Sequence, residues 1–442
     1  MNHVIPPSIQ AYVLPVLYGV VVVALLPLLA GYIVLLERKV MADMQARLGP
    51  MRVGPHGLLQ PIADALKLLI KEDIVPEKAD RFLFWCAPVL SVTMALLAYA
   101  AIPFGPVFQI ADLNVGLLFI LAISSLGIYG IVLGGWASNS HYSLLGALRS
   151  AAQLVSYETA AGLALVSGLM LAGSLSMKDI VQAQYDQGVW FVFVVPVGFF
   201  IYLVGSIAET NRAPFDLPEA ESELVAGYMT EYSGFRWALY FLGEYANMVV
   251  VAAIATTLFL GGWLRPFARY QDHLFGTSIE LLDLLPTILF LAAAAYCFWL
   301  APRQPVQIQK IVMALVGGLC LVLAAGMTGA LFAPDAVRLG IHGAFWFLAK
   351  VFAYIYAFLW IRFTFPRYRF DQLMRLGWRF LIPLALVNVI VVGTTIVLQQ
   401  NWEWRHPMLS AIVTTAIMLG VAAFLAREGS APSEPAEVGE GN

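Results

Sequence analysis

The chain has 442 residues, of which 60% are hydrophobic and only 12% are charged, and its formal net charge is −3. A mean hydropathy of +0.80, with several apolar runs of about 20 residues, exceeds what a soluble core requires and is typical of helices that cross a bilayer. The three cysteines stand apart, with no CxxC pair and no cysteine and histidine cluster. We therefore expect no zinc or iron–sulfur centre in this chain.

Apolar windows along the chain predict an all-α polytopic membrane protein with about eleven spans. The first window follows no basic segment, so it indicates a retained helix rather than a cleaved signal. Residues 427–442 are acidic and rich in Pro and Gly, which predicts a disordered tail. The predicted spans are 12–36, 82–103, 116–137, 150–173, 189–209, 237–263, 281–300, 311–332, 343–361, 379–399 and 408–426.

The distribution of basic residues predicts the orientation in the membrane. Of the 25 Lys and Arg residues, Lys350 lies within a span and most others fall in loops of one side. The positive-inside rule then places the N-terminus outside and the C-terminus in the cytoplasm. The segment 37–81 and the acidic loop after the fifth span face the cytoplasm. The bases predicted on the outer side are Lys178, Arg265, Arg269, Arg338 and Arg405.

The segment after the first span is not a simple solvated loop. From Gly57 onward apolar residues recur at helical spacing, with Asp64, Lys67 and Lys71 on the opposite face. This pattern predicts a short amphipathic helix, and the preceding "RLGPMRVGPHG" predicts a tightly folded turn. Taken alone, such a helix is either an interfacial anchor or the cap of a cavity.

Several ionisable residues lie inside or at the ends of predicted spans. Glu158 is roughly 12 Å deep and Glu244 about 9 Å from the inner end of its span, at a rise of about 1.5 Å per residue. One interpretation is that each is satisfied separately by a hydrogen bond or an ion pair. The other is a polar chain that carries protons inward from the cytoplasmic face. The candidate members are Glu37, Tyr157, Glu158, Glu209, Glu244, Tyr245 and Lys350.

The stretch "ETNRAPFDLPEAESELVAGYMTEYSG", residues 209–234, collects six carboxylates around Arg212. Closely spaced like charges favour sharing of protons near neutral pH. Charge alone favours a solvated acidic connector. The prolines on either side of Asp216 and the single base among the acids favour a structured loop with fixed ion pairs. The remaining candidate acids of the loop are Glu219, Glu221 and Glu223.

Four stretches together resemble the H subunit of the bacterial NADH-quinone oxidoreductase, respiratory complex I. They are "LLERKVMADMQARLGPMRVGPHGLLQPIADALKLLIKED", "LLGALRSAAQLVSYE", the acidic loop, and "FPRYRFDQLMRLGWRFLIPL". They occur in the expected order and cover most of the chain outside residues 265–341. The resemblance implies a membrane subunit at the joint between the hydrophilic redox arm and the membrane arm. There it forms the quinone entrance and chamber floor and the beginning of an acidic path to the proton pumps.

The resemblance also implies roles for individual residues. Quinone, such as ubiquinone, is the implied substrate, and FMN and iron–sulfur clusters are expected only in partner subunits. The implied partners are the hydrophilic quinone-site and iron–sulfur subunits, small membrane subunits, antiporter-like subunits and lipid of the bacterial inner membrane, with no nucleic acid. The implied quinone-chamber residues are Glu37, Arg38, Arg47, Asp64, Lys67, Arg212 and Asp216. The implied proton-path residues are Tyr157, Glu158, Glu209, Glu219, Glu221, Glu223, Glu244 and Tyr245.

Two features depart from the family pattern. Residues 265–341 form an insertion with two additional spans between an N-terminal membrane region, residues 1–264, and C-terminal helices, residues 342–426. His141 stands where the family pattern has a lysine. The alternative function is a self-contained secondary transporter that uses intramembrane acids. The sequence shows no clear inverted repeat, and a transporter should work alone in liposomes whereas the subunit should be inert without its partners.

Overall fold

The computed structural model describes residues 13–216, 225–266, 281–304, 306–401 and 407–429. Over these ranges the chain is helical and contains no strand, which confirms the predicted all-α fold. Nine helices in the described ranges are long and apolar enough to cross a membrane, and each overlaps a predicted window. These are Pro15–Met44, Arg81–Ala101, Gly116–Ala137, His141–Ala172, Gly234–Phe259, Leu282–Arg303, Gln307–Leu331, Val337–Thr364 and Phe370–Leu398.

The other two predicted windows contain shorter apolar helices, Pro196–Glu209 and Thr414–Ala423. In the first of these windows the helix is interrupted. A short helix ends at Val194, and the next begins at Pro196 after Val195, whose φ of −128° and ψ of 60° are not helical. Proline lacks the N–H that would continue the helical ladder, and it disfavours helical backbone in the residue before it.

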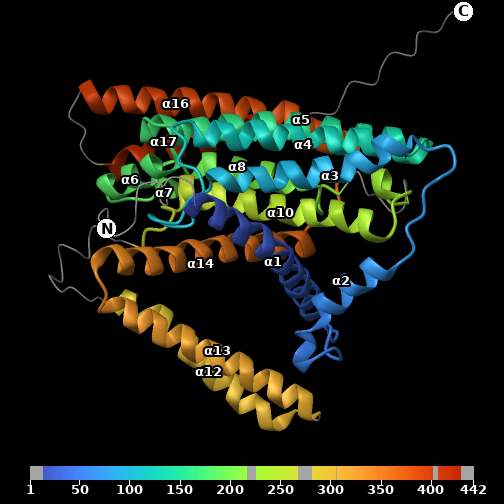
Figure 1. Ribbon diagram of the computed structural model, residues 1–442. Coiled ribbons are helices and arrows are strands. Elements are labelled where there is room, and N and C mark those ends of the chain that lie inside the picture. Colours follow the sequence, from blue (N-terminus) through green and yellow to red (C-terminus); the bar gives the residue numbers. More distant parts are fainter. Residues whose placement is uncertain (1–12, 217–224, 267–280, 305, 402–406, 430–442) are drawn as a thin grey trace, which may run out of the picture.

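The helical elements follow one another in the order shown in Figure 1. The longer helices are α1 (Leu14–Met44), α3 (Arg81–Ala98), α4 (Gly116–Ala137), α5 (His141–Ala172), α8 (Pro196–Glu209), α10 (Gly234–Phe259), α12 (Leu281–Leu300), α13 (Gln307–Leu331), α14 (Asp335–Thr364), α16 (Ile382–Asn401) and α17 (Pro407–Gly429). The shorter ones are η2 (Pro55–Gly57), α2 (Gln60–Ile70), η3 (Tyr99–Ala101), α6 (Met177–Gln187), α7 (Phe191–Val194), η4 (Gly227–Met229), η5 (Ala301–Arg303), α15 (Phe370–Arg375) and the π-helix η6 (Leu376–Leu381).

Helix α10 lies at the centre of the main bundle. It contacts α1, α3, α5, α8 and α14, and every residue from Met248 to Phe259 is buried. A helix that is apolar on all sides lies in the core of a large protein or spans a membrane, and the contacts of α10 place it in the core of the bundle. In Figure 1, α4 and α5 run alongside each other, and α16 packs on α5. The acidic residues of α5, α8 and α10 are therefore held within one packed unit.

The predicted amphipathic helix is α2. It contacts α1 and α10, and its apolar side chains remain largely uncovered, with Leu66 53%, Leu69 60% and Ile70 83% exposed. Asp64 on its polar side accepts a hydrogen bond of 2.8 Å from Nη1 of Arg38 on α1. An apolar face left open next to membrane-spanning helices suits the membrane interface.

The two spans predicted between residues 265 and 341 form the hairpin α12–α13. These helices pack mainly against each other and reach the rest of the protein through α14 and η2. Figure 1 shows the hairpin diverging from the main bundle below α14. Two polar contacts lie at its joint. Arg265 pairs with Asp283 on α12 at 3.1 Å, and the His342 ring of α14 hydrogen-bonds the Met327 carbonyl of α13 at 3.2 Å.

We expect deletion of about residues 270–336, with the flanks rejoined by a short linker, to preserve assembly and the quinone reduction that the resemblance implies. Both flanks are anchored without the hairpin, because Lys350 of α14 donates to the Leu264 carbonyl at 2.5 Å. Removing two spans also restores the sidedness of everything downstream. Quinone reduction in membranes, with an inhibitor control, measures the outcome. Normal assembly with lost quinone reduction contradicts a peripheral role for the hairpin.

The Tyr240 side chain of α10, whose hydroxyl donates to the Gly130 carbonyl of α4, gives a second expectation. A Cβ at Gly134 would lie 2.1 Å from the hydroxyl oxygen of Tyr240, which is only 1% exposed. Gly134→Ala should therefore destabilise the protein by about 1–3 kcal/mol, as overpacking does. Gly326→Ala in α13 is the matched control, because no atom lies within 4 Å of its added Cβ. Thermal inactivation of the two variants measures the difference, and equal midpoints contradict it.

Candidate functional site

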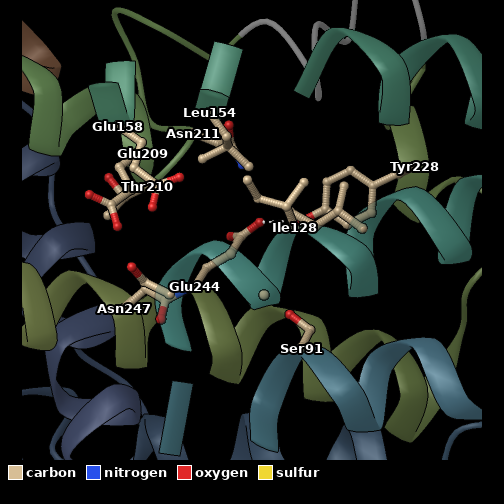
Figure 2. A pocket seen from close by; sticks show the side chains of 13 residues that line it. Ser91, Ile128, Leu154, Glu158, Glu209, Thr210, Asn211, Tyr228, Glu244 and Asn247 are labelled. Carbon is tan, nitrogen blue, oxygen red and sulfur yellow. Dashed lines mark hydrogen bonds between the residues drawn. The ribbon is translucent and has the colours of Figure 1, made fainter. Parts of the chain in front are cut away.

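Three carboxylates from three helices line one pocket. Glu158 comes from α5, Glu209 from the end of α8 and Glu244 from α10. Figure 2 shows all three side chains around this pocket. Glu158 and Glu244 are 86 positions apart in the sequence, yet the fold brings both of them and Glu209 to the same pocket. The other lining residues are Ser91, Ser124, Gly127, Ile128, Ile131, Leu154, Thr210, Asn211, Tyr228 and Asn247.

Glu244 is held from two directions. Nη2 of Arg212 donates to its Oε2 at 3.0 Å, and the Tyr228 hydroxyl donates to its Oε1 at 2.8 Å, the contact drawn in Figure 2. The side chains of Arg212 and Glu244 are 7% and 10% exposed. The guanidinium of Arg212 also lies over the Tyr245 ring, 4.5 Å from its centroid. Such a pair is costly to break, because removing one partner leaves a buried charge unpaired.

Glu158 and Glu209 differ from Glu244 in their partners. The Ser125 hydroxyl of α4 donates a hydrogen bond to Oε1 of Glu158. Glu209 makes no hydrogen bond or ion pair with any residue that the structure describes. A carboxylate that faces a pocket without a fixed partner can exchange a proton with neighbours or water more readily than one held by an arginine.

Residues 210–216 of the acidic loop are largely buried and structured. Thr210, Asn211, Arg212 and Asp216 are each no more than 8% exposed. The side-chain amide of Gln153 on α5 donates to the carbonyl oxygens of Ala208 and Phe215, and Asn211 has a positive φ of 50°. These contacts fix the turn that follows α8. The interpretation as a solvated connector is therefore wrong for residues 210–216, because α5 binds both ends of this turn.

Beyond the pocket, the polar contacts continue to the end of α1. The Tyr245 hydroxyl donates to Oε2 of Glu37 at 2.7 Å, and Arg362 of α14 pairs with Oε1 of the same carboxylate. The Arg212 guanidinium lies over the Tyr245 ring. Glu37, Tyr245, Arg212 and Glu244 are thus linked by direct contacts from α1 to the pocket.

The other residues predicted for the quinone chamber lie on the same side of the protein as the end of α1. Asp64 accepts from Arg38 and, at 3.0 Å, from the Gln60 amide. Asp216 pairs with Arg367 at 3.1 Å. Arg47 is exposed and donates to its neighbour Gln45 at 2.7 Å, and Lys67 is exposed on α2. Glu219, Glu221 and Glu223 lie outside the described residues.

Two predicted members of the polar chain have other partners. The ammonium of Lys350 donates to three backbone carbonyls, those of Leu260, Gly262 and Leu264, at 2.6, 2.9 and 2.5 Å. It also lies 4.3 Å from the centroid of the Trp190 ring. Lys350 is therefore satisfied separately from the carboxylates, as one of the two interpretations of the buried ionisable residues expects. It binds the carbonyls at the end of α10, where a cation suits the helix dipole. The Tyr157 hydroxyl donates to the Leu373 carbonyl at 2.9 Å rather than to a pocket acid.

Several contributing residues were not predicted from the sequence. Gln153 could have been predicted from the sequence, because an amide inside the apolar α5 requires a polar partner. Ser125, Tyr228, Arg362 and Arg367 have weaker signals, because serines, tyrosines and arginines near helix ends are common in membrane proteins. In the described residues, no group of three or more His, Cys, Asp or Glu side chains is arranged to hold a metal ion.

Comparison with known proteins identifies the family. The model of a family described as NADH dehydrogenase matches residues 17–393. The NADH-quinone oxidoreductase H subunit 2 of Solibacter usitatus is 56% identical over 389 residues, which cover 86% of this chain and 95% of the relative. The H subunit 1 of Koribacter versatilis is 52% identical over 416 residues, 91% of this chain and 93% of that protein. The H subunit of Magnetococcus marinus is 44% identical over 362 residues, which cover 82% and 85%.

These matches extend along most of each chain, and they agree with the membrane-spanning helical fold. The four stretches singled out in the sequence lie within the range that the family model matches. The chain belongs to the H-subunit family of NADH-quinone oxidoreductase, and it is a membrane subunit of that oxidoreductase complex.

Proposed function

We propose that this chain forms the entrance and floor of a quinone chamber and the beginning of an acidic route from quinone reduction to proton translocation. The observation that carries the proposal is the linked set Glu37, Tyr245, Arg212 and Glu244, which ends at the pocket shared with Glu209. A chain of ionisable groups at several depths is how protons cross hydrocarbon. The name of the relatives supplies the substrate class, NADH and quinone.

The chain would act through charge rather than through electron transfer. Flavin and iron–sulfur groups would sit in partner subunits, and quinone would be reduced where those subunits meet the end of α1. A change of charge there would act first on Glu37 and Asp216, which are paired with Arg362 and Arg367. Because such pairs are partly buried, a new charge nearby is screened less than in water. Their rearrangement would reach Glu244 through Tyr245 and Arg212.

The remaining assignments follow the same proposal. Arg38, Arg47, Asp64 and Lys67 would line or support the entrance, where α2 leaves apolar side chains open to lipid. The N-terminus would face outward and the C-terminus the cytoplasm of a bacterial inner membrane. The chain would divide into an N-terminal membrane region (residues 1–264), the inserted hairpin segment (residues 265–341) and the C-terminal helices (residues 342–426).

Tyr245→Phe tests the link between the entrance and the pocket. The change removes the hydrogen bond to Glu37, 2.7 Å long, while the ring remains beneath Arg212. We expect the complex to assemble and to reduce quinone, but to pump fewer protons for each quinone reduced. Proton uptake and NADH oxidation in proteoliposomes measure that ratio.

The matched control is Tyr129→Phe, because Tyr129 is 59% exposed on α4. It should leave the ratio of protons to quinone unchanged. If Tyr245→Phe keeps the wild-type ratio, the proposed route through Tyr245 is wrong.

A further inference from the structure

The tip of the α12–α13 hairpin carries bases and no acid. Helix α12 ends at Leu300 and α13 begins at Gln307, with Arg303 exposed between them and Lys310 half-buried in the first turn of α13. No Asp or Glu occurs from residue 284 to residue 334. Within the described ranges, neither base forms an ion pair with a carboxylate.

A second basic segment lies against the same hairpin. Helix α13 contacts η2, the turn that follows the end of α1. Residues 44–63 around that turn contain Arg47 and Arg52, both exposed, and no acid. The tip and the turn therefore present positive charge on the same side of the membrane, with no carboxylate in either segment.

Exposed apolar side chains are interleaved with these bases. Trp299 is 54% exposed, Ile308 67% and Ile311 52%. The Arg303 guanidinium lies 3.4 Å from the centroid of the Trp299 ring. Helices of 20 and 25 residues span the hydrocarbon core, so residues within a turn of their ends lie at headgroup depth. Tryptophan with nearby Arg or Lys is the usual composition at that depth.

We propose that the hairpin tip binds the headgroup of an anionic phospholipid, with its phosphate at Arg303 and Lys310 and its acyl chains along Ile308 and Ile311. Arginine and lysine both bind phosphate oxygens. Basic pockets between membrane helices select anionic headgroups. The depth of the tip favours lipid over an acidic protein partner, because its exposed apolar side chains continue along two membrane-spanning helices. This site is separate from the carboxylate pocket and does not depend on its proposed function.

The test uses the complete purified complex in phosphatidylcholine nanodiscs that contain a small fraction of a photoreactive lipid. One sample carries photoreactive phosphatidylglycerol and the other photoreactive phosphatidylcholine with the same acyl chain. Mass spectrometry of the labelled peptides locates the probe. We expect the phosphatidylglycerol probe to label the tip in excess over the phosphatidylcholine probe.

The excess should fall in Arg303→Gln/Lys310→Gln by about fivefold for each base lost, which corresponds to about 1 kcal/mol per base near an anionic surface. Arg303→Lys/Lys310→Arg should retain it, because both charges remain. Lys78→Gln/Arg81→Gln is the control for loss of two bases elsewhere, since these lie beside the acids Glu77 and Asp80. That variant should keep the wild-type excess at the tip.

Three results would overturn the proposal. Equal labelling by the two probes in the wild type means that the tip meets only bulk lipid. An unchanged excess in the glutamine variant means that the two bases do not select the headgroup. A photocrosslink from Ile308→p-benzoylphenylalanine to another subunit means that a protein covers this surface. If the glutamine variant fails to assemble, the labelling ratio of the two probes in the wild type and in Arg303→Lys/Lys310→Arg still tests the proposal.

Discussion

Arg212→Ala is expected to reduce the amount of assembled complex and to lower its thermal inactivation midpoint strongly. The substitution removes one partner of a pair whose side chains are 7% and 10% exposed, so it leaves Glu244 buried beside an empty space. Breaking such a pair costs about 3–5 kcal/mol. It also removes the cation from the Tyr245 ring, 4.5 Å away, and so interrupts the contacts that link Glu37 to the pocket.

Lys178→Ala is the matched control. Lys178 pairs with Asp112 at 2.7 Å, closer than Arg212 and Glu244, but the two side chains are 32% and 57% exposed. Exposed pairs contribute about 0–1 kcal/mol, so this variant should assemble normally. Comparing the two variants shows whether the burial of an ion pair, rather than the distance between its charged atoms, determines how much assembly is lost. Similar assembly and activity in the two variants would falsify the idea of a structured pair at Glu244.

A double variant distinguishes stability from function at the same site. Arg212→Met/Glu244→Leu removes both charges. A protein in which apolar side chains of similar size replace a buried ion pair is often as stable as before. We expect assembly to recover in large measure. Proton pumping should not recover, because Leu cannot carry a proton. If pumping returns together with assembly, the pair has only a structural role.

The sequence predicts the helices well because each crossing requires a long apolar run, and the requirement is local. In the described portion of the chain nine windows contain long helices and two contain shorter ones. The interruption at Pro196, in one of these two, has a local cause that proline itself signals. The α12–α13 hairpin is likewise visible in the sequence as two long apolar runs. The direction in which the hairpin leaves the bundle cannot be predicted from the sequence, because it depends on which of its side chains contact α14 and η2.

The polar contacts were less predictable, because they depend on which helix faces meet. Lys350 and Glu244 both look like buried charges in need of a partner, yet the lysine binds the carbonyls of residues 260–264 and the glutamate binds Arg212. Tyr157 adjoins Glu158 in sequence, but consecutive residues of a helix point in directions about 100° apart. Its hydroxyl therefore bonds to the Leu373 carbonyl of α15, while Glu158 faces the pocket.

Glu209→Gln is expected to leave the complex assembled while lowering proton pumping by about a hundredfold, the lower end of what removal of a proton-transferring group causes. Glutamine keeps the volume of the side chain and can still accept a hydrogen bond, but it cannot release a proton. Glu209 is the pocket acid with no hydrogen bond or ion pair to a described residue, so its substitution breaks no fixed contact. We therefore expect this substitution to lower proton pumping without reducing assembly, unlike a substitution that breaks a hydrogen bond or an ion pair.

Two further variants make the outcome decisive. Glu77→Gln removes a carboxylate from an exposed position and should have no effect on assembly or pumping. Glu158→Gln should lower pumping as Glu209→Gln does, since both acids line the same pocket, but it also alters the hydrogen bond from Ser125. Assembly is measured by native gel, quinone reduction by NADH oxidation, and pumping by a pH-sensitive dye in proteoliposomes. If Glu209→Gln pumps as many protons for each quinone reduced as the wild type does, protons do not pass through Glu209. The pocket then has only a structural role.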